Sequence, residues 1–227
     1  MSDAEAYADA IVGRSRDAAD AFRRLDQAAT DRIVEAVFRA AFEARVELAR
    51  LAVEETGIGL FEHKVIKNAW ASLLIFEHIR SRRTVGVLSH DTERGITEIA
   101  RPIGPVLALT PVTNPTSTTI FKTLICLKTR NPVIFSFHGG ARSCSRAAAR
   151  ILKDAAEAAG APAHAIQWIQ RSTGDHLDAV MRHPELALIL ATGTVPLVRR
   201  AQQSGTPTLG VGPGNVPTYV DRSADLE

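Results

Sequence analysis

Four short turns rich in glycine and hydroxyl groups are the residues of this sequence best suited to chemistry. Each follows a short apolar run: Thr110–Asn114 (TPVTN), Ser136–Gly140 (SFHGG), Thr192–Thr194 (TGT) and Gly212–Asn215 (GPGN). Three of them open toward a helical pattern. The start of a helix offers unpaired backbone N–H groups and a partial positive charge, and glycine lets a phosphate approach the backbone. The recurrence of this arrangement indicates a phosphate-containing ligand.

Each turn also has a plain structural interpretation, because short connections from strand to helix often need glycine. The string GVGPGN at 210–215 resembles the G-x-G-x-x-G dinucleotide fingerprint. It is followed by Val216, Pro217 and another extended run, whereas the fingerprint must open a helix. This string alone therefore does not predict a dinucleotide site.

The elements that position these turns alternate between strand and helix from residue 104 onward. Apolar runs predict strands at 106–110, 132–136, 165–169, 186–191 and 206–211, separated by helical patterns at 117–129, 141–159, 174–182 and 195–204. Such alternation is typical of an α/β fold with a parallel sheet, which binds its ligand beyond the carboxyl ends of the strands.

The first part of the chain has a different pattern. Residues 3–82 carry apolar side chains three or four apart, which predicts helices with a break at 56–59. Residues 84–101 predict a β-hairpin arm around a polar turn at 90–95, and a hairpin this short needs another sheet or subunit to pair with. We therefore expect a helical part of the cofactor domain at 1–83, an oligomerisation arm at 84–101 and an α/β core at 102–227.

Composition argues against several classes of protein. The 227 residues carry a formal net charge of only +2 without a basic stripe, so a nucleic-acid partner is not expected. No apolar run approaches the roughly 20 residues of a membrane helix, so we expect a cytoplasmic protein. The two cysteines, Cys126 and Cys144, lack the spacing of a disulfide framework or a zinc site, and no metal is expected.

Several longer stretches resemble a known family. These are LALTPVTNPTSTTIFKTLICLKTRNPVIFS, EETGIGLFEHKVIKNAW, LILATG and GVGPGNVP. In this order they closely resemble the CoA-acylating aldehyde dehydrogenases, especially the aldehyde half of bifunctional aldehyde-alcohol dehydrogenases. The resemblance runs from about Ala29 to the last residue and implies a Rossmann-like NAD-binding domain.

The resemblance also implies a reaction. A cysteine thiolate attacks the aldehyde, hydride passes to NAD, and the resulting thioester gives its acyl group to coenzyme A. Similarity to the bifunctional group favours acetaldehyde as the substrate and a homo-oligomer as the assembly. Hydrolytic relatives carry a glutamate where this sequence has Val211, and without that general base the thioester would wait for a thiol.

The family's site residues map onto this sequence as follows. Asn114 is similar to the side-chain donor of the oxyanion hole, although an Asn-Pro pair also forms turns on its own. The implied NAD contacts are Thr110, Pro111, Val112, Ser136, Phe137, His138, Gly139, Thr192, Gly193, Thr194, Val211 and Gly212. Relatives have proline at Phe137 and often glycine at Thr194. Lys122 is similar to a lysine near the cofactor, the alternative being a lysine on the helix surface.

The family's nucleophilic cysteine belongs to a stretch after GVGPGN that this sequence does not contain. Cys126 lies within a predicted helix, and Cys144 lies in the first turn of the next one, a position that can lower the pKa of a thiol. Neither matches the nucleophile. We therefore expect a cofactor-binding half that is inactive alone, with a non-catalytic nucleotide-binding or assembly module as the alternative. A hydrolytic aldehyde dehydrogenase fragment is disfavoured by Val211.

Overall fold

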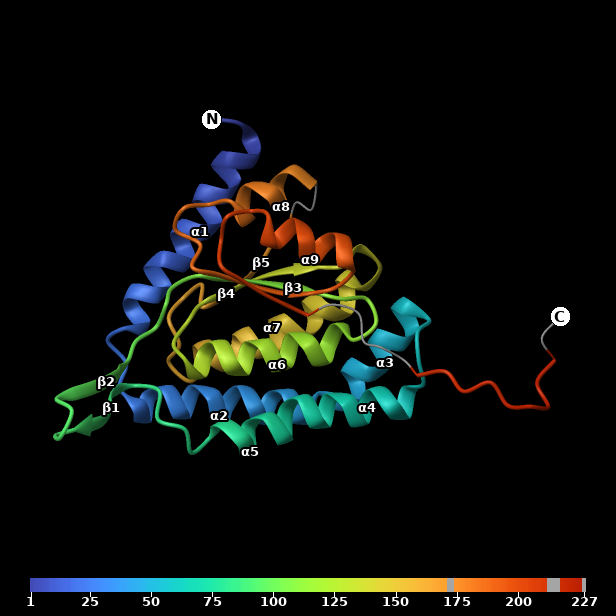
Figure 1. Cartoon of the computed structure of the whole chain (residues 1–227), viewed down its shortest axis with the longest axis horizontal. Coiled ribbons are helices and arrows are strands. Elements are labelled where there is room, and N and C mark those ends of the chain that lie inside the picture. Colours follow the sequence, from blue (N-terminus) through green and yellow to red (C-terminus); the bar gives the residue numbers. More distant parts are fainter. Residues whose placement is uncertain (171–173, 212–216, 226–227) are drawn as a thin grey trace.

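A computed structural model describes residues 1–170, 174–211 and 217–225 of the chain (Figure 1). The helices are α1 (Asp3–Phe22), α2 (Gln27–Glu43), α3 (Arg45–Thr56), α4 (Phe61–Ala69), α5 (Ile75–Ile79), α6 (Pro115–Lys128), α7 (Arg142–Ala158), α8 (Gly174–Met181) and α9 (Val195–Gln202). The strands are β1 (Gly86–Asp91), β2 (Ile96–Ala100), β3 (Val106–Thr110), β4 (Val133–Phe137), β5 (Ile166–Trp168), β6 (Leu188–Thr192) and β7 (Thr208–Val211).

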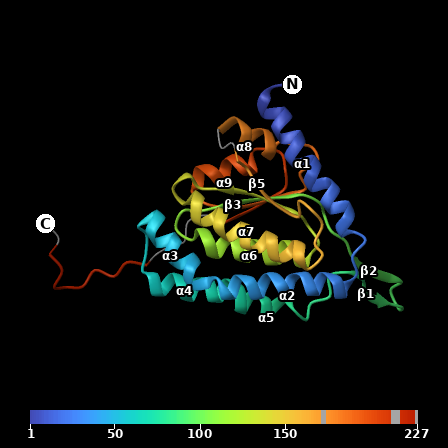
Figure 2. The same ribbon diagram turned by 180° about the vertical axis from the view of Figure 1, so that it is seen from behind.

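Five of the strands form one sheet in the order β5-β4-β3-β6-β7, and every neighbouring pair is parallel. The predicted parallel sheet is thus confirmed. Helices α1, α8 and α9 cover one face of this sheet, and α6 and α7 cover the other (Figures 1 and 2). A further layer that includes α2, α4 and α5 lies against α6 and α7 on the side away from the sheet.

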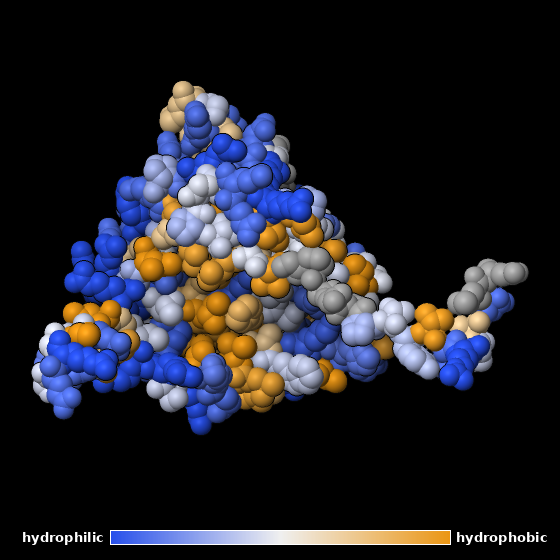
Figure 3. All heavy atoms as spheres, in the orientation of Figure 1, coloured by the Kyte–Doolittle hydropathy of each residue, from blue (hydrophilic) through white to orange (hydrophobic). Residues whose placement is uncertain are grey.

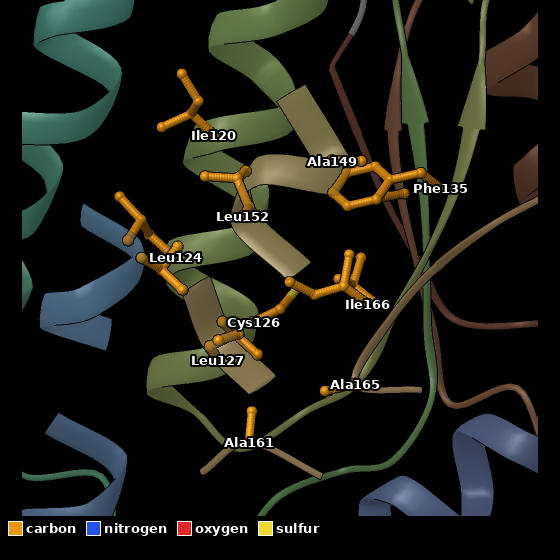
Figure 4. Close-up of a cluster of buried hydrophobic side chains, with 14 of the residues drawn as sticks. Ile120, Leu124, Cys126, Leu127, Phe135, Ala149, Leu152, Ala161, Ala165 and Ile166 are labelled. Carbon is orange, nitrogen blue, oxygen red and sulfur yellow. The ribbon is translucent and has the colours of Figure 1, made fainter. Parts of the chain in front are cut away.

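The central strand β3 is buried along its whole length because both faces of the sheet are covered. Val106 and Ala108 belong to the core shared with α2, α6 and α7, whereas Leu107 and Leu109 belong to the core shared with α1, α8 and α9. Figure 4 shows part of the first core, in which side chains of α6 and α7 meet Phe135 of β4. The continuous apolar run of β3 is therefore the pattern of a doubly covered strand.

The predicted break in the helical segment is confirmed. Gly57 adopts a left-handed conformation, with φ of 63°, and ends α3. The helical segment after this break contains one wide π-helical stretch, Trp70–Leu74, between α4 and α5. Ser72 Oγ donates to the carbonyl oxygen of Asn68 at 2.7 Å inside this stretch. Such wide turns often accompany functional sites.

The predicted hairpin is also present. Strands β1 and β2 pair antiparallel with an irregularity between Val87 and Ser89, and they form a sheet separate from the main one. The arm projects from the body at the end opposite to the C-terminal tail of residues 217–225 (Figures 1 and 2). The division of the chain into three parts at 83 and 101 stays a prediction.

Candidate active site at the strand ends

The sheet brings three of the predicted turns to one edge. In the register of the sheet, Leu109 lies beside both Ser136 and Ala191, so that Thr110, Ser136 and Thr192 all lie at the carboxyl ends of adjacent strands. Thr110 Oγ1 donates to the carbonyl oxygen of Ser136 at 3.4 Å, which is a long hydrogen bond. The edge formed by β3, β4 and β6 is the place where such folds bind ligands.

The turns after β3 and β4 lie against each other. His138 Nδ1 accepts a hydrogen bond from the backbone N–H of Gly140 at 3.1 Å. A Cβ on Gly140 would lie 3.7 Å from Val112 Cγ2, whereas a Cβ on Gly139 would meet no atom within 4 Å. Among the described residues, open space therefore borders Gly139, while Val112 and His138 lie beside Gly140.

Phe137 lies in the strand β4 and not in the turn after it. Its side chain is buried and stacks on Phe135, with ring centroids 5.6 Å apart. Any contact that Phe137 makes with a ligand at the strand ends is consequently a backbone contact.

The turn after β6 has the features of an anion site. Thr194 caps α9 without a side-chain hydrogen bond to the helix, so the backbone N–H groups of Val195 and Leu197 in the first turn have no partner within the helix, while Pro196 has no N–H. A Cβ on Gly193 would lie 3.0 Å from Leu197 Cδ2, so the Leu197 side chain packs closely against the glycine. Val211 pairs with Thr192 and is 62% exposed at the end of β7. Gly212, another predicted contact, lies outside the described residues.

Asn114 stands at the start of α6, and its amide is held by a lysine. Lys67 Nζ lies 3.0 Å from Asn114 Oδ1. Because an ammonium group has only donors, this contact assigns the oxygen to Lys67 and leaves Nδ2 with a 3.4 Å contact to Thr113 Oγ1. Within residues 1–170, 174–211 and 217–225, one N–H of Asn114 therefore has no partner and can donate to a ligand.

Helix α4 supports this turn with buried side chains that sequence reasoning missed. Lys64 Nζ donates to the carbonyl oxygen of Thr113 at 2.9 Å, and Thr116 Oγ1 donates to Asn68 Oδ1 at 2.9 Å. Burial, and then the charge of Lys67, lowers the pKa of Lys64. A signal was available, because residues 64, 67 and 68 are spaced to share one face of a helix.

Lys122 lies beneath the strand ends. Its side chain is only 2% exposed, and Nζ donates to the carbonyl oxygens of Leu109 at 2.7 Å and Leu190 at 2.8 Å. Burial lowers the pKa of Lys122 to about 7. The alternative of a surface lysine is therefore wrong. The ammonium group joins the ends of β3 and β6 from inside the protein.

Neither cysteine has the properties of a nucleophile. Both Cys126 and Cys144 are buried, and burial raises the pKa of each thiol to about 12. The expectation of a lowered pKa at Cys144 is wrong, because burial and the Glu55 carboxylate oppose the thiolate. Glu55 instead accepts hydrogen bonds from the backbone N–H groups of Ser143 and Cys144 at the start of α7.

An apolar groove adjoins Asn114. It has a volume of about 410 Å³ and is lined in part by Trp70, Leu74 and Phe121. Trp70 is 60% exposed there. Figure 3 shows hydrophobic side chains gathered on this face of the molecule around α5 and α6. The groove offers an apolar surface next to the free amide N–H of Asn114.

In the described part of the chain, no group of three or more histidine, cysteine or acidic residues is arranged to hold a metal ion. None of the described helices is both long enough and apolar enough to span a membrane.

Comparisons with known proteins agree with this geometry. The model of the aldehyde dehydrogenase family matches residues 1–227. Aldehyde-alcohol dehydrogenase 2 of Entamoeba histolytica is 50% identical over 197 residues, which cover 87% of this chain and 23% of that protein. The chain thus spans about a quarter of the length of this relative.

Solved structures are similar as well. An acetylating aldehyde dehydrogenase from Geobacillus thermoglucosidasius has a TM-score of 0.91 and 42% identity, over 98% of this chain and 49% of its own. A Rhodopseudomonas palustris propionaldehyde dehydrogenase, solved with propionyl-CoA bound, has a TM-score of 0.79 and 29% identity, over 92% and 46% of the two chains. The chain spans about half of each structure.

Proposed function

The chain belongs to the aldehyde dehydrogenase family, and from this premise we propose that it supplies the cofactor-binding half of an NAD-dependent, CoA-acylating aldehyde dehydrogenase. Two features that lie together at one edge of the sheet support the proposal. Glycine-containing turns end β4 and β6, and Asn114 points a free amide N–H beside an apolar groove.

The residues at the strand ends suit a dinucleotide. The first turn of α9 and Gly193 would hold the pyrophosphate, because the helix start has N–H groups without a partner in the helix and Gly193 adds no side chain of its own. Ser136 and His138 would contact the adenosine side, and the backbone of Thr110–Val112 would flank the nicotinamide ribose. When bound, NAD supplies the hydride acceptor of the oxidation.

Asn114 would donate its free Nδ2 hydrogen to the carbonyl oxygen of the aldehyde. One preorganised donor of this kind stabilises a transition state by about 3 kcal/mol. Lys67 would hold the amide in the required orientation and add positive charge near the developing oxyanion. The groove beside Trp70 and Phe121 would take the alkyl group, with acetaldehyde as the proposed substrate.

The thiolate of the reaction would come from a residue other than Cys126 and Cys144, since both thiols are buried and protonated at neutral pH. Val211 at the end of β7 provides no carboxylate to activate water. This favours transfer of the acyl group to a thiol over formation of an acid. The acetylating relative and the relative with bound propionyl-CoA support coenzyme A as the acceptor.

A non-catalytic assembly module is the second candidate. It is favoured by the exposed apolar side chains of the arm, which include Val87, Ile96 and Ile99. Such a surface suits pairing with a second copy of the chain. The two candidates differ in whether the strand ends bind a dinucleotide.

Fluorescence titration of NADH into the purified chain tests the proposal. We expect saturable binding that Gly193→Ala weakens about tenfold or more, because a Cβ would narrow the approach to the α9 N-terminus. The fold should survive, since only the flexible Leu197 side chain must move. Gly13→Ala, where a Cβ meets no atom within 4 Å, is the matched control. Absence of NADH binding by the folded chain would favour the assembly module.

A further inference from the structure

A second cavity lies at the root of the arm, away from the strand ends. It has a volume of about 700 Å³ and is bordered by the α1–α2 connection, the beginning of β1, the end of β2 and Arg130, the second residue after α6. Three of its nine lining residues are arginines: Arg23, Arg101 and Arg130. None of the described residues that line it is acidic. The cavity is therefore a concentration of positive charge.

Arg130 is the buried member of the three, with 4% of its surface exposed. Its Nη1 donates to the carbonyl oxygens of Leu25 at 3.2 Å and Arg23 at 3.5 Å, and Nη2 donates to that of Ala100 at 3.4 Å. Most of these are longer than a normal hydrogen bond. Arg130 Nε has no hydrogen-bond partner among the described residues. The guanidinium is thus held by uncharged acceptors alone, at Nη1 and Nη2, and its Nε is buried.

The charges of this cavity are also incompletely balanced. Arg23 has an ion pair with Asp20 at 2.9 Å. Within residues 1–170, 174–211 and 217–225, neither Arg101 nor Arg130 has a carboxylate oxygen within 4.0 Å. A buried guanidinium without a counter-ion is costly, because burying a charge is tolerated when it is paired.

The backbone conformation of Arg130 adds a second unfavourable contribution to the free energy of folding. Its φ is 57°, in the left-handed region, immediately after the last turn of α6. Glycine or asparagine usually ends a helix in this way, because a larger side chain costs about 1–2 kcal/mol there. The end of the helix therefore gives no reason for an arginine at this position.

We propose that this cavity binds a carboxylate group. Arg130 lines the cavity, and its Nη2 keeps one hydrogen without a partner among the described residues, which a carboxylate oxygen can accept. Arg101 supplies a further positive charge from its exposed position at the rim. The carboxylate belongs either to a small free acid or to an acidic side chain of a second copy of the chain, since the cavity adjoins the exposed arm. This inference does not depend on the NAD site.

Malonate is the probe for the test, added at constant ionic strength so that salt screening does not change. The readouts are the thermal midpoint of the chain and the NMR signal of the Arg130 Nε–H. We expect a saturable rise of the midpoint and a saturable shift of that signal. A folded wild-type chain in which malonate changes neither readout overturns the proposal.

Variants locate the effect. Arg101→Gln should weaken malonate binding about tenfold, the loss of one charge-assisted contact. Arg24→Gln removes a neighbouring exposed arginine that does not line the cavity and should leave the affinity unchanged. Arg130→Lys keeps the charge and the backbone constraint but removes the Nη2 donor, so it should weaken malonate binding about tenfold or more in a chain that circular dichroism shows to be folded. Equal losses in the Arg24 and Arg101 variants would contradict a site in this cavity.

Sedimentation velocity distinguishes the two sources of carboxylate. If the ligand is an acidic side chain of a second copy, the chain associates with rising concentration, and both malonate and Arg101→Gln reduce that association. If the ligand is a free acid, malonate binds without changing the sedimentation coefficient. Either result supports a carboxylate site and identifies what fills it.

Discussion

Strand β3 and the arm strands β1 and β2 are all short strands, but β3 is almost wholly apolar and the arm strands carry polar and charged residues as well. All five residues of β3 are buried, whereas nearly every residue of β1 and β2 is exposed. β3 pairs with β4 and β6, and the arm strands pair only with each other. The comparison teaches that a strand-forming pattern predicts local conformation, while covering layers and partners decide how much that strand contributes to stability.

The largest expected difference between the main sheet and the arm is the loss in free energy of unfolding when an apolar side chain is truncated. Phe135→Ala should lower the free energy of unfolding by about 3–5 kcal/mol, because Phe135 fills the core between the sheet, α6 and α7. Ile99→Ala in the arm should cost less than about 0.5 kcal/mol, since its side chain is 53% exposed. Urea denaturation of both variants measures this. A cost above about 2 kcal/mol at Ile99 would mean that the arm is covered in solution.

The next largest effect is a pH dependence of the free energy of unfolding, which arises at the main sheet and not in the arm. The folded pKa of Lys122 is about 7, against an ordinary value of 10.5. Between these values the unfolded chain binds one proton more, so the free energy of unfolding rises with pH by about 1 kcal/mol per unit from pH 7.5 to 8.5. Below pH 7 this contribution is constant.

Lys122→Met should flatten that slope, and Lys153→Met, on the outer part of α7, should leave it unchanged. Above about pH 8 the two buried thiols act in the opposite direction, because their folded pKa values are raised and the unfolded chain loses protons first. The wild type and Lys122→Met share both thiols, so the difference between their slopes at pH 7.5, 8.0 and 8.5 isolates the contribution of Lys122. An equal slope in the wild type and Lys122→Met would show that the lysine is solvated.

A smaller loss of stability is expected when the side chain of Asn68, which supports the Asn114 turn, is removed. Asn68→Ala would leave Thr116 Oγ1 and the carbonyl oxygen of Arg45 without their partner, at a cost of about 1–3 kcal/mol. Lys67→Ala on the same helix removes an exposed side chain and should change stability by less than about 0.5 kcal/mol. Thermal denaturation compares the two. Equal costs would mean that the buried network does not hold the turn.

The smallest effect should be a stabilisation. Gly13 lies within α1, away from the left-handed region, and a Cβ there meets no atom within 4 Å. Gly13→Ala should raise the free energy of unfolding by about 0.5–1 kcal/mol through lower entropy of the unfolded chain. A loss of stability, measured by urea denaturation, would show that α1 packs more closely than the structure describes.

Much of the body could be predicted from the sequence because its strands and helices carry strong local patterns. The strand at 106–110 has the expected bounds, and the gathering of Thr110, Ser136 and Thr192 follows from parallel strand order. Lys122 could not be placed in this way. Its bond to the carbonyl oxygen of Leu190 joins residues 68 positions apart, and no local pattern reports such a contact.

The arm and the Asn114 turn show the same limit of prediction from sequence. The hairpin was predicted from its turn, but the cavity at its root depends on Arg130, whose contacts reach back to Arg23 and Leu25. The spacing of Lys64 and Asn68 indicated a shared helical face without naming what that face supports. Long-range contacts of single polar side chains are thus the part of the site that periodicity does not reveal.

Amide hydrogen exchange of the chain with and without saturating NADH tests the central claim most directly, because it compares the strand ends with the arm in one experiment. We predict slower exchange at residues 110–114, 136–140 and 192–195 and no change at residues 86–100. Unchanged exchange at all three strand ends, under conditions in which NADH binding saturates, would contradict the proposed cofactor site.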